Sequence, residues 1–255
     1  MTRIDINCDM GEIPEAIADG TQESLMPFLT SVNIACGGHA GDENTMKTTI
    51  EQAQRWHLAI GAHPSYPDRE NFGRVEMSIS PQAIADSVFE QVHALAEIAE
   101  GCGAAITHVK PHGALSNQAA KDRALAQAIA GGVARWRRDV MLVGLARSLA
   151  LDVFREAGFH VAAEAFADRR YEADGSLRSR KFDDALIRDP SLAAQQALRI
   201  ARQGTVVAVD GKEVAVEAQT ICIHGDTPGA RQIAAAVAYA LRESGVELAP
   251  LSHRK

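Results

Sequence analysis

The sequence has no hydrophobic run long enough to cross a membrane. Its longest unbroken apolar stretch covers residues 233–241, which is about half of a transmembrane helix. The first five residues lead directly into charged side chains and leave no room for the apolar core of a signal peptide. Basic residues are too few to favour nucleic-acid binding, because 26 Lys and Arg stand against 33 Asp and Glu, a net charge of −7. We therefore expect a soluble, cytoplasmic protein without a membrane or nucleic-acid partner.

Cysteine-based architectures and the common catalytic motifs are absent as well. The four cysteines, Cys8, Cys36, Cys102 and Cys222, lie far apart and form no CxxC pair, which argues against a zinc ribbon or a disulfide framework. The chain also contains no HExxH, no GxSxG and no GxxxxGK[ST]. The sequence therefore carries no zincin helix, no serine-hydrolase elbow and no standard phosphate-binding loop.

Short apolar runs alternate with longer amphipathic segments along the whole chain. Seven runs have the length and composition of strands that are covered on both faces, as in parallel sheets: 4–8, 32–36, 59–62, 106–109, 141–145, 161–166 and 220–223. Segments such as 80–101, 190–203 and 228–244 repeat apolar residues at helical spacing. This pattern predicts a single α/β domain over 1–255, built as a seven-stranded parallel β/α barrel of the TIM type, with an open doubly wound sheet as the second choice.

One insertion interrupts the alternation between residues 204 and 218. The runs 206–209 and 213–216 have strand-like composition, and Asp210-Gly211 lies between them. Asp-Gly is a pair that two-residue hairpin turns favour, so we expect an inserted β-hairpin near 204–218.

Polar side chains gather directly after five of the seven runs, where the carboxyl ends of the strands are expected. The main ones are Asp9, Glu12, His39, His63, Lys110, His112 and His224. A lone histidine at a strand end usually bonds to the backbone, but four at equivalent positions favour a functional site, and active sites of β/α barrels form at this end. Three imidazoles and a carboxylate also suit a divalent metal such as zinc, with Asp9, His39, His63 and His112 as candidate ligands.

Several blocks of the sequence resemble the LamB/YcsF family. The blocks are 5–12, 33–42, 61–74, 108–115, 164–169 and 224–226, and they extend over nearly the whole chain. The resemblance implies a seven-stranded barrel of the glycoside hydrolase/deacetylase type. It also implies the ATP-dependent hydrolytic opening of 5-oxoproline (pyroglutamate) to L-glutamate, together with two partner subunits, B and C, of a 5-oxoprolinase.

This reaction suggests roles for the residues expected to be catalytic. Under this hypothesis Asp9 is the general base for the attacking water, is oriented by His39 and His112, and acts together with Glu12. Lys110 would stabilise the developing oxyanion or a phosphoryl oxygen.

The same hypothesis assigns residues that bind the substrate. Arg69 or Arg74 would hold the substrate carboxylate through a bidentate guanidinium contact. Asn33, His63 and Asp226 complete the expected binding residues. Either this barrel binds ATP through an unconventional loop, or a partner subunit phosphorylates the lactam and this chain opens the ring. Because no lysine-bearing glycine loop is present, the sequence favours the second alternative.

Two other readings remain open from the sequence. The histidine-rich strand ends would also suit a stand-alone, metal-dependent deacetylase or amidase that needs no ATP. Alternatively, the barrel is a non-catalytic scaffold that positions its partners.

Overall fold

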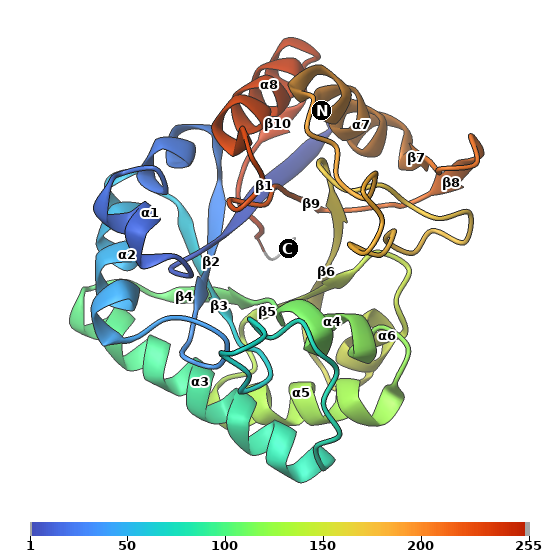
Figure 1. Cartoon of the computed structure of the whole chain (residues 1–255). Helices are drawn as coiled ribbons and strands as arrows, with labels where there is room; N and C mark the ends of the chain where they lie inside the picture. The colour runs from blue at the N-terminus through green and yellow to red at the C-terminus, as the bar shows by residue number, and fades with distance from the viewer. Residues whose placement is uncertain (1, 253–255) are drawn as a thin grey trace.

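The computed structural model describes residues 2–252, which form a closed barrel of parallel strands surrounded by helices (Figure 1). Within these residues, the barrel strands are β1 (Arg3–Met10), β2 (Ser31–Ala35), β3 (Ala59–His63), β4 (Ile106–Val109), β5 (Met141–Leu145), β6 (His160–Phe166) and β9 (Thr220–Cys222). They are hydrogen-bonded in this order, and β9 pairs with β1 to close the ring. The seven-stranded parallel barrel predicted from the sequence is confirmed, and the open sheet is excluded.

Helices cover the outside of the ring. The longer ones are α2 (Glu43–Arg55), α3 (Pro81–Gly101), α5 (Arg123–Trp136), α6 (Leu149–Glu156), α7 (Pro190–Gln203) and α8 (Ala230–Glu243), and the short ones are α1 (Pro14–Ala18), η1 (Glu23–Phe28) and α4 (Gly113–Ala119). Ser80 and Asp189 each precede a proline and cap α3 and α7 by accepting hydrogen bonds from backbone N–H groups. α8 begins later than the expected residue 228, because Gly229 adopts a left-handed conformation just before it. No helix among residues 2–252 has both the length and the apolar character needed to span a membrane.

Side chains of β1 alternate between the helix-facing core and the interior of the ring. Ile4 and Ile6 pack in the hydrophobic core. Asp5, Asn7 and Asp9 instead form hydrogen bonds with side chains of neighbouring strands. This alternation follows from the extended backbone, whose successive side chains point to opposite faces. The ring interior is therefore polar along β1, whereas branched apolar residues usually fill a TIM barrel.

The inserted hairpin is present, but its turn is longer than expected. β7 (Thr205–Val207) and β8 (Glu213–Ala215) pair antiparallel, with Val207 opposite Glu213. Residues 208–212 connect them, and the amide of Val209 donates to the backbone oxygen of Tyr171 at 2.9 Å instead of to the opposite strand. The prediction of a two-residue Asp-Gly turn is therefore wrong.

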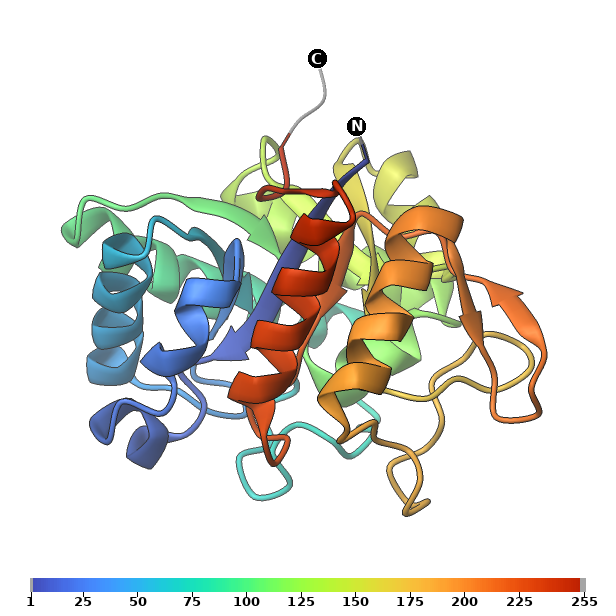
Figure 2. The same cartoon turned by 90° about the horizontal axis from the view of Figure 1, so that it is seen from above.

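The two ends of the barrel differ. In Figure 2, β1 begins at one end, where β10 (Glu247–Leu248) pairs with its first residues. The connections after β3 and β6, residues 64–80 and 167–189, project from the opposite end (Figure 2). All seven parallel strands finish at that end, so the polar residues that follow them surround one opening.

Candidate functional site

Lys110, directly after β4, is the centre of a buried polar network inside the barrel. Its Nζ lies 2.8 Å from Oδ1 of Asp9, 2.8 Å from Oε1 of Glu164 and 3.2 Å from Oδ1 of Asn7. Burial lowers the pKa of Lys110, but Asp9, Cys222 and Glu164 outweigh this effect and hold the pKa well above its usual range. Nζ also donates to Sγ of Cys222 at 3.3 Å, so its three hydrogen bonds go to Asp9, Asn7 and Cys222, while Glu164 pairs with its charge. Lys110 therefore has no free N–H for a substrate, which removes the geometric basis for its predicted role at the oxyanion.

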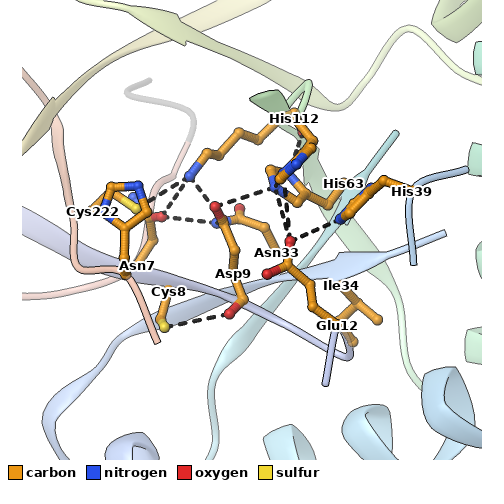
Figure 3. A network of polar contacts seen from close by, with 12 residues as sticks. Asn7, Cys8, Asp9, Glu12, Asn33, Ile34, His39, His63, His112 and Cys222 are labelled. Atoms are coloured by element: carbon orange, nitrogen blue, oxygen red, sulfur yellow. Dashed lines mark hydrogen bonds and ion pairs between the residues drawn. The ribbon is translucent and has the colours of Figure 1, made fainter. Parts of the chain in front are cut away.

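Asp9 connects this network to the histidines (Figure 3). Its Oδ1 accepts from Lys110 and from Nδ2 of Asn33, and its Oδ2 lies 3.2 Å from Nε2 of His63. Burial raises the pKa of Asp9, but His63 and Lys110 outweigh burial and hold the pKa well below its usual range. Because both oxygens are engaged, the structure does not favour Asp9 as the base for an attacking water.

His63 and His112 direct their second ring nitrogens toward each other. Nδ1 of His63 lies 2.7 Å from the backbone oxygen of Lys110, and Nε2 of His112 lies 2.9 Å from that of Phe72. A carbonyl oxygen only accepts, so these two nitrogens carry protons. In the neutral rings, Nε2 of His63 and Nδ1 of His112 are then lone-pair nitrogens, and they are 2.9 Å apart. This arrangement requires a cation, either a proton or a metal ion, next to the two nitrogens.

Glu12 places a carboxylate beside the two imidazoles. Its Oε1 lies 3.4 Å from Nδ1 of His112 and 3.9 Å from Nε2 of His63. The same oxygen lies 2.8 Å from Nε2 of His39, whose ring stacks on His112 (Figure 3). Burial and the charge of Asp9 raise the pKa of Glu12. His39 therefore positions the carboxylate of Glu12 through this contact.

Four side chains form a cluster of potential metal ligands. One donor atom from each of Asp9, Glu12, His63 and His112 lies within 4.8 Å of the others. The sequence predicted His39 in place of Glu12. The structure differs because Nε2 of His39 already faces Glu12, and Nδ1 of His39 is buried without a partner among the described residues.

A cavity of about 930 Å³ opens over this cluster. The predicted site residues that line it are Asp9, Glu12, His63, Arg74, Lys110, His112 and Asp226. Arg74 and Asp226 form an ion pair at its rim, with 2.6 Å between Nη2 and Oδ2. The charge that Arg74 could offer a substrate carboxylate is therefore already balanced.

Three predicted site residues lie outside the cavity lining. His39 is behind Glu12, and the buried Asn33 donates to Asn7 and Asp9, so Asn33 positions Asp9 and does not reach a substrate. The exposed Arg69 donates to the backbone oxygen of Gly41. The prediction that Arg69 binds the substrate carboxylate is not supported, since the conformation of residues 64–80 directs its guanidinium to another loop.

Three buried members of the network were not among the residues predicted from the sequence: Asn7, His108 and Glu164. Nδ2 of Asn7 donates to Oε1 of Glu164 at 3.0 Å, and Nε2 of His108 lies 2.8 Å from Oδ1 of Asn33. Each of them lies within a strand and not after one. The signal that could have revealed them is a polar residue inside an otherwise apolar strand that is covered on both faces.

A second histidine–carboxylate pair joins the ends of β6 and β9. Nδ1 of His224 lies 2.9 Å from Oδ1 of Asp168. The other carboxylate oxygen of Asp168, Oδ2, accepts hydrogen bonds from the backbone N of His224 and from Oγ1 of Thr227. Asp168 is fully buried, whereas His224 lines the cavity. Nδ1 therefore donates to Asp168, while Nε2 has no hydrogen-bond partner among residues 2–252.

Comparisons with known proteins agree with this fold. The chain is 50% identical over 246 residues to a protein from Chloroflexus aggregans that is named as the A subunit of 5-oxoprolinase, a match that covers 96% of this chain and 98% of the relative. A protein of the same name from Tolumonas auensis is 47% identical, with 97% and 99% covered. The solved structure of a lactam utilization protein from Thermus thermophilus has a TM-score of 0.91 at 40% identity and covers 98% of this chain and 100% of that one. Residues 4–255 match the LamB/YcsF family, and the chain belongs to it.

Proposed function

We propose that this chain is the ring-opening subunit of a 5-oxoprolinase, which hydrolyses the lactam of 5-oxoproline to L-glutamate with consumption of ATP. The observation that carries the proposal is the full-length similarity to proteins named as the A subunit of 5-oxoprolinase. The word subunit in that name indicates partner chains, and we expect these to be subunits B and C. Because the reaction consumes ATP, we also expect the complex to work in the cytoplasm.

Hydrolysis adds water to the lactam carbonyl carbon and breaks the bond from that carbon to the ring nitrogen. The water gives up a proton, and the nitrogen must receive one. Glu12 offers the acceptor, since His39 holds its Oε1 and its Oε2 has no partner among the described residues. His224 offers the donor in its imidazolium form, since its Nδ1–H then bonds to Asp168 and its Nε2 carries the second proton into the cavity. Both side chains line the same cavity, and we expect one bound ring to contact both.

Asp9, His63 and His112 fit a divalent cation. Two imidazoles and a carboxylate, with a position left for substrate or water, are the donors of many catalytic zinc sites. The second ring nitrogen of each histidine is fixed by a backbone carbonyl, which is the usual outer-shell arrangement of a metal-bound histidine. A bound cation supplies Lewis-acid polarisation of a substrate oxygen. We propose that these three residues hold it and that Glu12 stays beside it as the proton acceptor.

ATP enters this proposal through the partner subunits. The chain has no GxxxxGK[ST] loop. A lactam is stabilised by resonance, and transfer of the γ-phosphoryl group of ATP to its oxygen makes the carbonyl carbon more open to attack by water. We expect a partner to carry out this transfer. In the present cavity one water then adds to the activated carbon and the C–N bond breaks, which leaves an acyl phosphate, and a second water hydrolyses that acyl phosphate to glutamate and phosphate.

Glutamate release from 5-oxoproline and ATP tests the function. The chain is mixed with candidate subunits B and C, and each component is omitted in turn. We expect release only from the complete mixture and a loss of about 100-fold or more in Glu12→Gln, because general-base catalysis contributes about that much. Glu15→Gln, an exposed change at the start of α1, is the matched control.

Three results would contradict the proposal. One is full activity without this chain, and another is wild-type activity of Glu12→Gln. The third is amide or acetyl hydrolysis by the isolated chain without ATP, which would favour a stand-alone deacetylase or amidase. Activity that survives Glu12→Gln but depends on partner binding would instead indicate a scaffold.

Elemental analysis tests the metal site independently of activity. We expect about one divalent ion per purified chain, and a higher melting temperature after zinc is added to the chelator-treated protein. His63→Ala and His112→Ala should lose both effects, whereas the half-exposed His93→Ala should keep them. Equal metal content in His63→Ala and the wild type would rule out this ligand set.

A further inference from the structure

Arg169 is a buried guanidinium in the wall of the cavity, and it has no carboxylate partner within residues 2–252. It follows β6 and is only 7% exposed. Its Nη2 donates to the backbone oxygen of Arg178 at 2.6 Å, and its Nε has no partner among the described residues. A charge removed from water is strongly disfavoured unless an opposite charge compensates it. Burial and the neighbouring Arg180 lower the pKa of Arg169 to about 10, in agreement with this lack of compensation.

The other arginines of this wall differ from Arg169. Arg178 is paired with Glu172 at 2.9 Å and with Asp184 at 2.7 Å. Arg74 and Arg180 share Asp226. The acid next to Arg169 in the chain, Asp168, is already occupied by His224 and Thr227. Arg147 also lines the cavity, but it is exposed and donates to the backbone oxygen of Ala215. Arg169 is therefore the buried guanidinium in this wall that is left to pair with an anion entering the cavity.

We propose that Arg169 binds the carboxylate of the lactam substrate and that the site thereby selects lactams that carry a carboxylate next to the ring nitrogen. This assignment rests on the proposed function. A guanidinium binds a carboxylate through two parallel hydrogen bonds, so it fixes orientation as well as position.

The chemistry of the substrate fits this placement. In 5-oxoproline the carboxylate is attached to the carbon next to the ring nitrogen, so the group that binds the carboxylate must lie near the group that protonates the nitrogen. Arg169 and Asp168 are consecutive, and Asp168 holds His224, the proposed proton donor. Anchoring the carboxylate at Arg169 therefore directs the ring nitrogen toward His224 and the carbonyl toward the Asp9 and Glu12 side of the same cavity.

The test compares 5-oxoproline with its neutral analogue, 5-oxoprolinamide, in the complete complex. We expect Arg169→Gln to lower kcat/KM for 5-oxoproline by about 100-fold, mainly through KM, and to change the value for the amide less than about threefold. Arg169→Lys keeps the positive charge but loses the two parallel N–H donors of the guanidinium. Its selectivity for 5-oxoproline should therefore lie between those of Arg169→Gln and the wild type. Arg202→Gln, which removes an exposed guanidinium of α7 outside the cavity lining, should leave both substrates unchanged.

Two outcomes would overturn the assignment. An equal loss for both substrates in Arg169→Gln would mean that the arginine only supports residues 167–189 through its bond to Arg178. Unchanged selectivity, with weaker binding of ATP or inorganic phosphate to the chain, would mean that the anion is a phosphoryl group.

A binding measurement separates failure of this assignment from failure of the proposed function. Calorimetric titration of the isolated chain with 5-oxoproline and with the amide requires neither partners nor ATP. If the wild-type complex releases no glutamate, the proposed function fails. The carboxylate assignment then stands if Arg169→Gln binds 5-oxoproline as weakly as the amide, and falls if it binds 5-oxoproline like the wild type.

Discussion

Lys110 and Glu164 form an ion pair in the interior of the barrel, with 2.8 Å between Nζ and Oε1 and neither side chain more than 6% exposed. Asp9 bonds to the same ammonium. We expect Lys110→Met to lower the free energy of unfolding by about 3–5 kcal/mol, because it leaves two buried carboxylates without a counter-charge. Urea unfolding followed by circular dichroism measures this difference.

The exposed Lys47 on α2 provides the matched control. Lys47→Met should change the free energy of unfolding by less than about 0.5 kcal/mol, as surface substitutions usually do. Adding Glu164→Gln to Lys110→Met should recover part of the lost stability, because one of the two unpaired charges is removed. Equal stability of Lys110→Met and Lys47→Met would contradict the buried network.

Gly61 on β3 provides the space that the imidazole of His108 occupies on β4. A Cβ placed at Gly61 would overlap the ring atoms of His108. We expect Gly61→Ala to lower the free energy of unfolding by about 1–3 kcal/mol, because the ring and its bond to Asn33 must shift. In a double-mutant cycle, the effect of Gly61→Ala should become smaller when His108 is already replaced by alanine.

Gly101, the last residue of α3, is the control for this substitution. No atom lies within 4 Å of a Cβ placed there. Gly101→Ala should be neutral or stabilise the protein by up to about 1 kcal/mol, because alanine favours the helix. If Gly61→Ala behaves like Gly101→Ala, the proposed contact does not restrict residue 61.

The sequence predicted the fold well because the relevant signal is local. The runs 106–109 and 141–145 coincide with β4 and β5, since both strands are short, apolar and bounded by polar turns. The sequence also predicted correctly that Asp9, His63 and His112 lie close together, because all parallel strands of a barrel finish at one end. The hairpin turn was mispredicted because its geometry depends on Tyr171, which is distant in the chain.

The roles of single side chains depend on partners that no local pattern reveals. Lys110 is saturated by four residues from three other strands, so its lack of a free N–H could not be read from its neighbours in the chain. Similarly, Arg69, Arg74 and Arg169 are alike as sequence features. They differ because Arg69 bonds to a backbone oxygen, Arg74 pairs with Asp226, and Arg169 has no carboxylate partner among residues 2–252.

Asp5 makes stability depend on pH in the acidic range. Burial raises its pKa from 3.8 to about 6, although hydroxyl groups of Thr220, Thr30 and Ser31 partly oppose the shift. Between pH 4 and pH 6 the folded protein therefore binds a proton that the unfolded chain has released. This contribution is fully present below pH 4 and is lost as the pH rises through 6, by about 3 kcal/mol in total.

Asp5→Asn removes this contribution. We expect the free energy of unfolding of the variant, relative to the wild type, to increase by about 3 kcal/mol between pH 4 and pH 7. Urea unfolding at several pH values measures the difference, and Asp183→Asn on an exposed loop shows the effect of deleting one charge. A constant difference between Asp5→Asn and the wild type over this range would show that Asp5 does not titrate as expected.

Gly131 and Gly132 are adjacent in α5, yet they should respond oppositely to alanine. A Cβ at Gly132 would lie 2.5 Å from the backbone oxygen of Ala85 on α3, whereas nothing lies within 4 Å of one at Gly131. Gly131→Ala should therefore raise the free energy of unfolding by about 1 kcal/mol through helix propensity. Gly132→Ala gains the same propensity but forces α3 and α5 apart, so we expect a net loss of about 1–2 kcal/mol. Thermal and urea unfolding of the two variants measure the difference, and a stabilising Gly132→Ala would contradict the close contact between the helices.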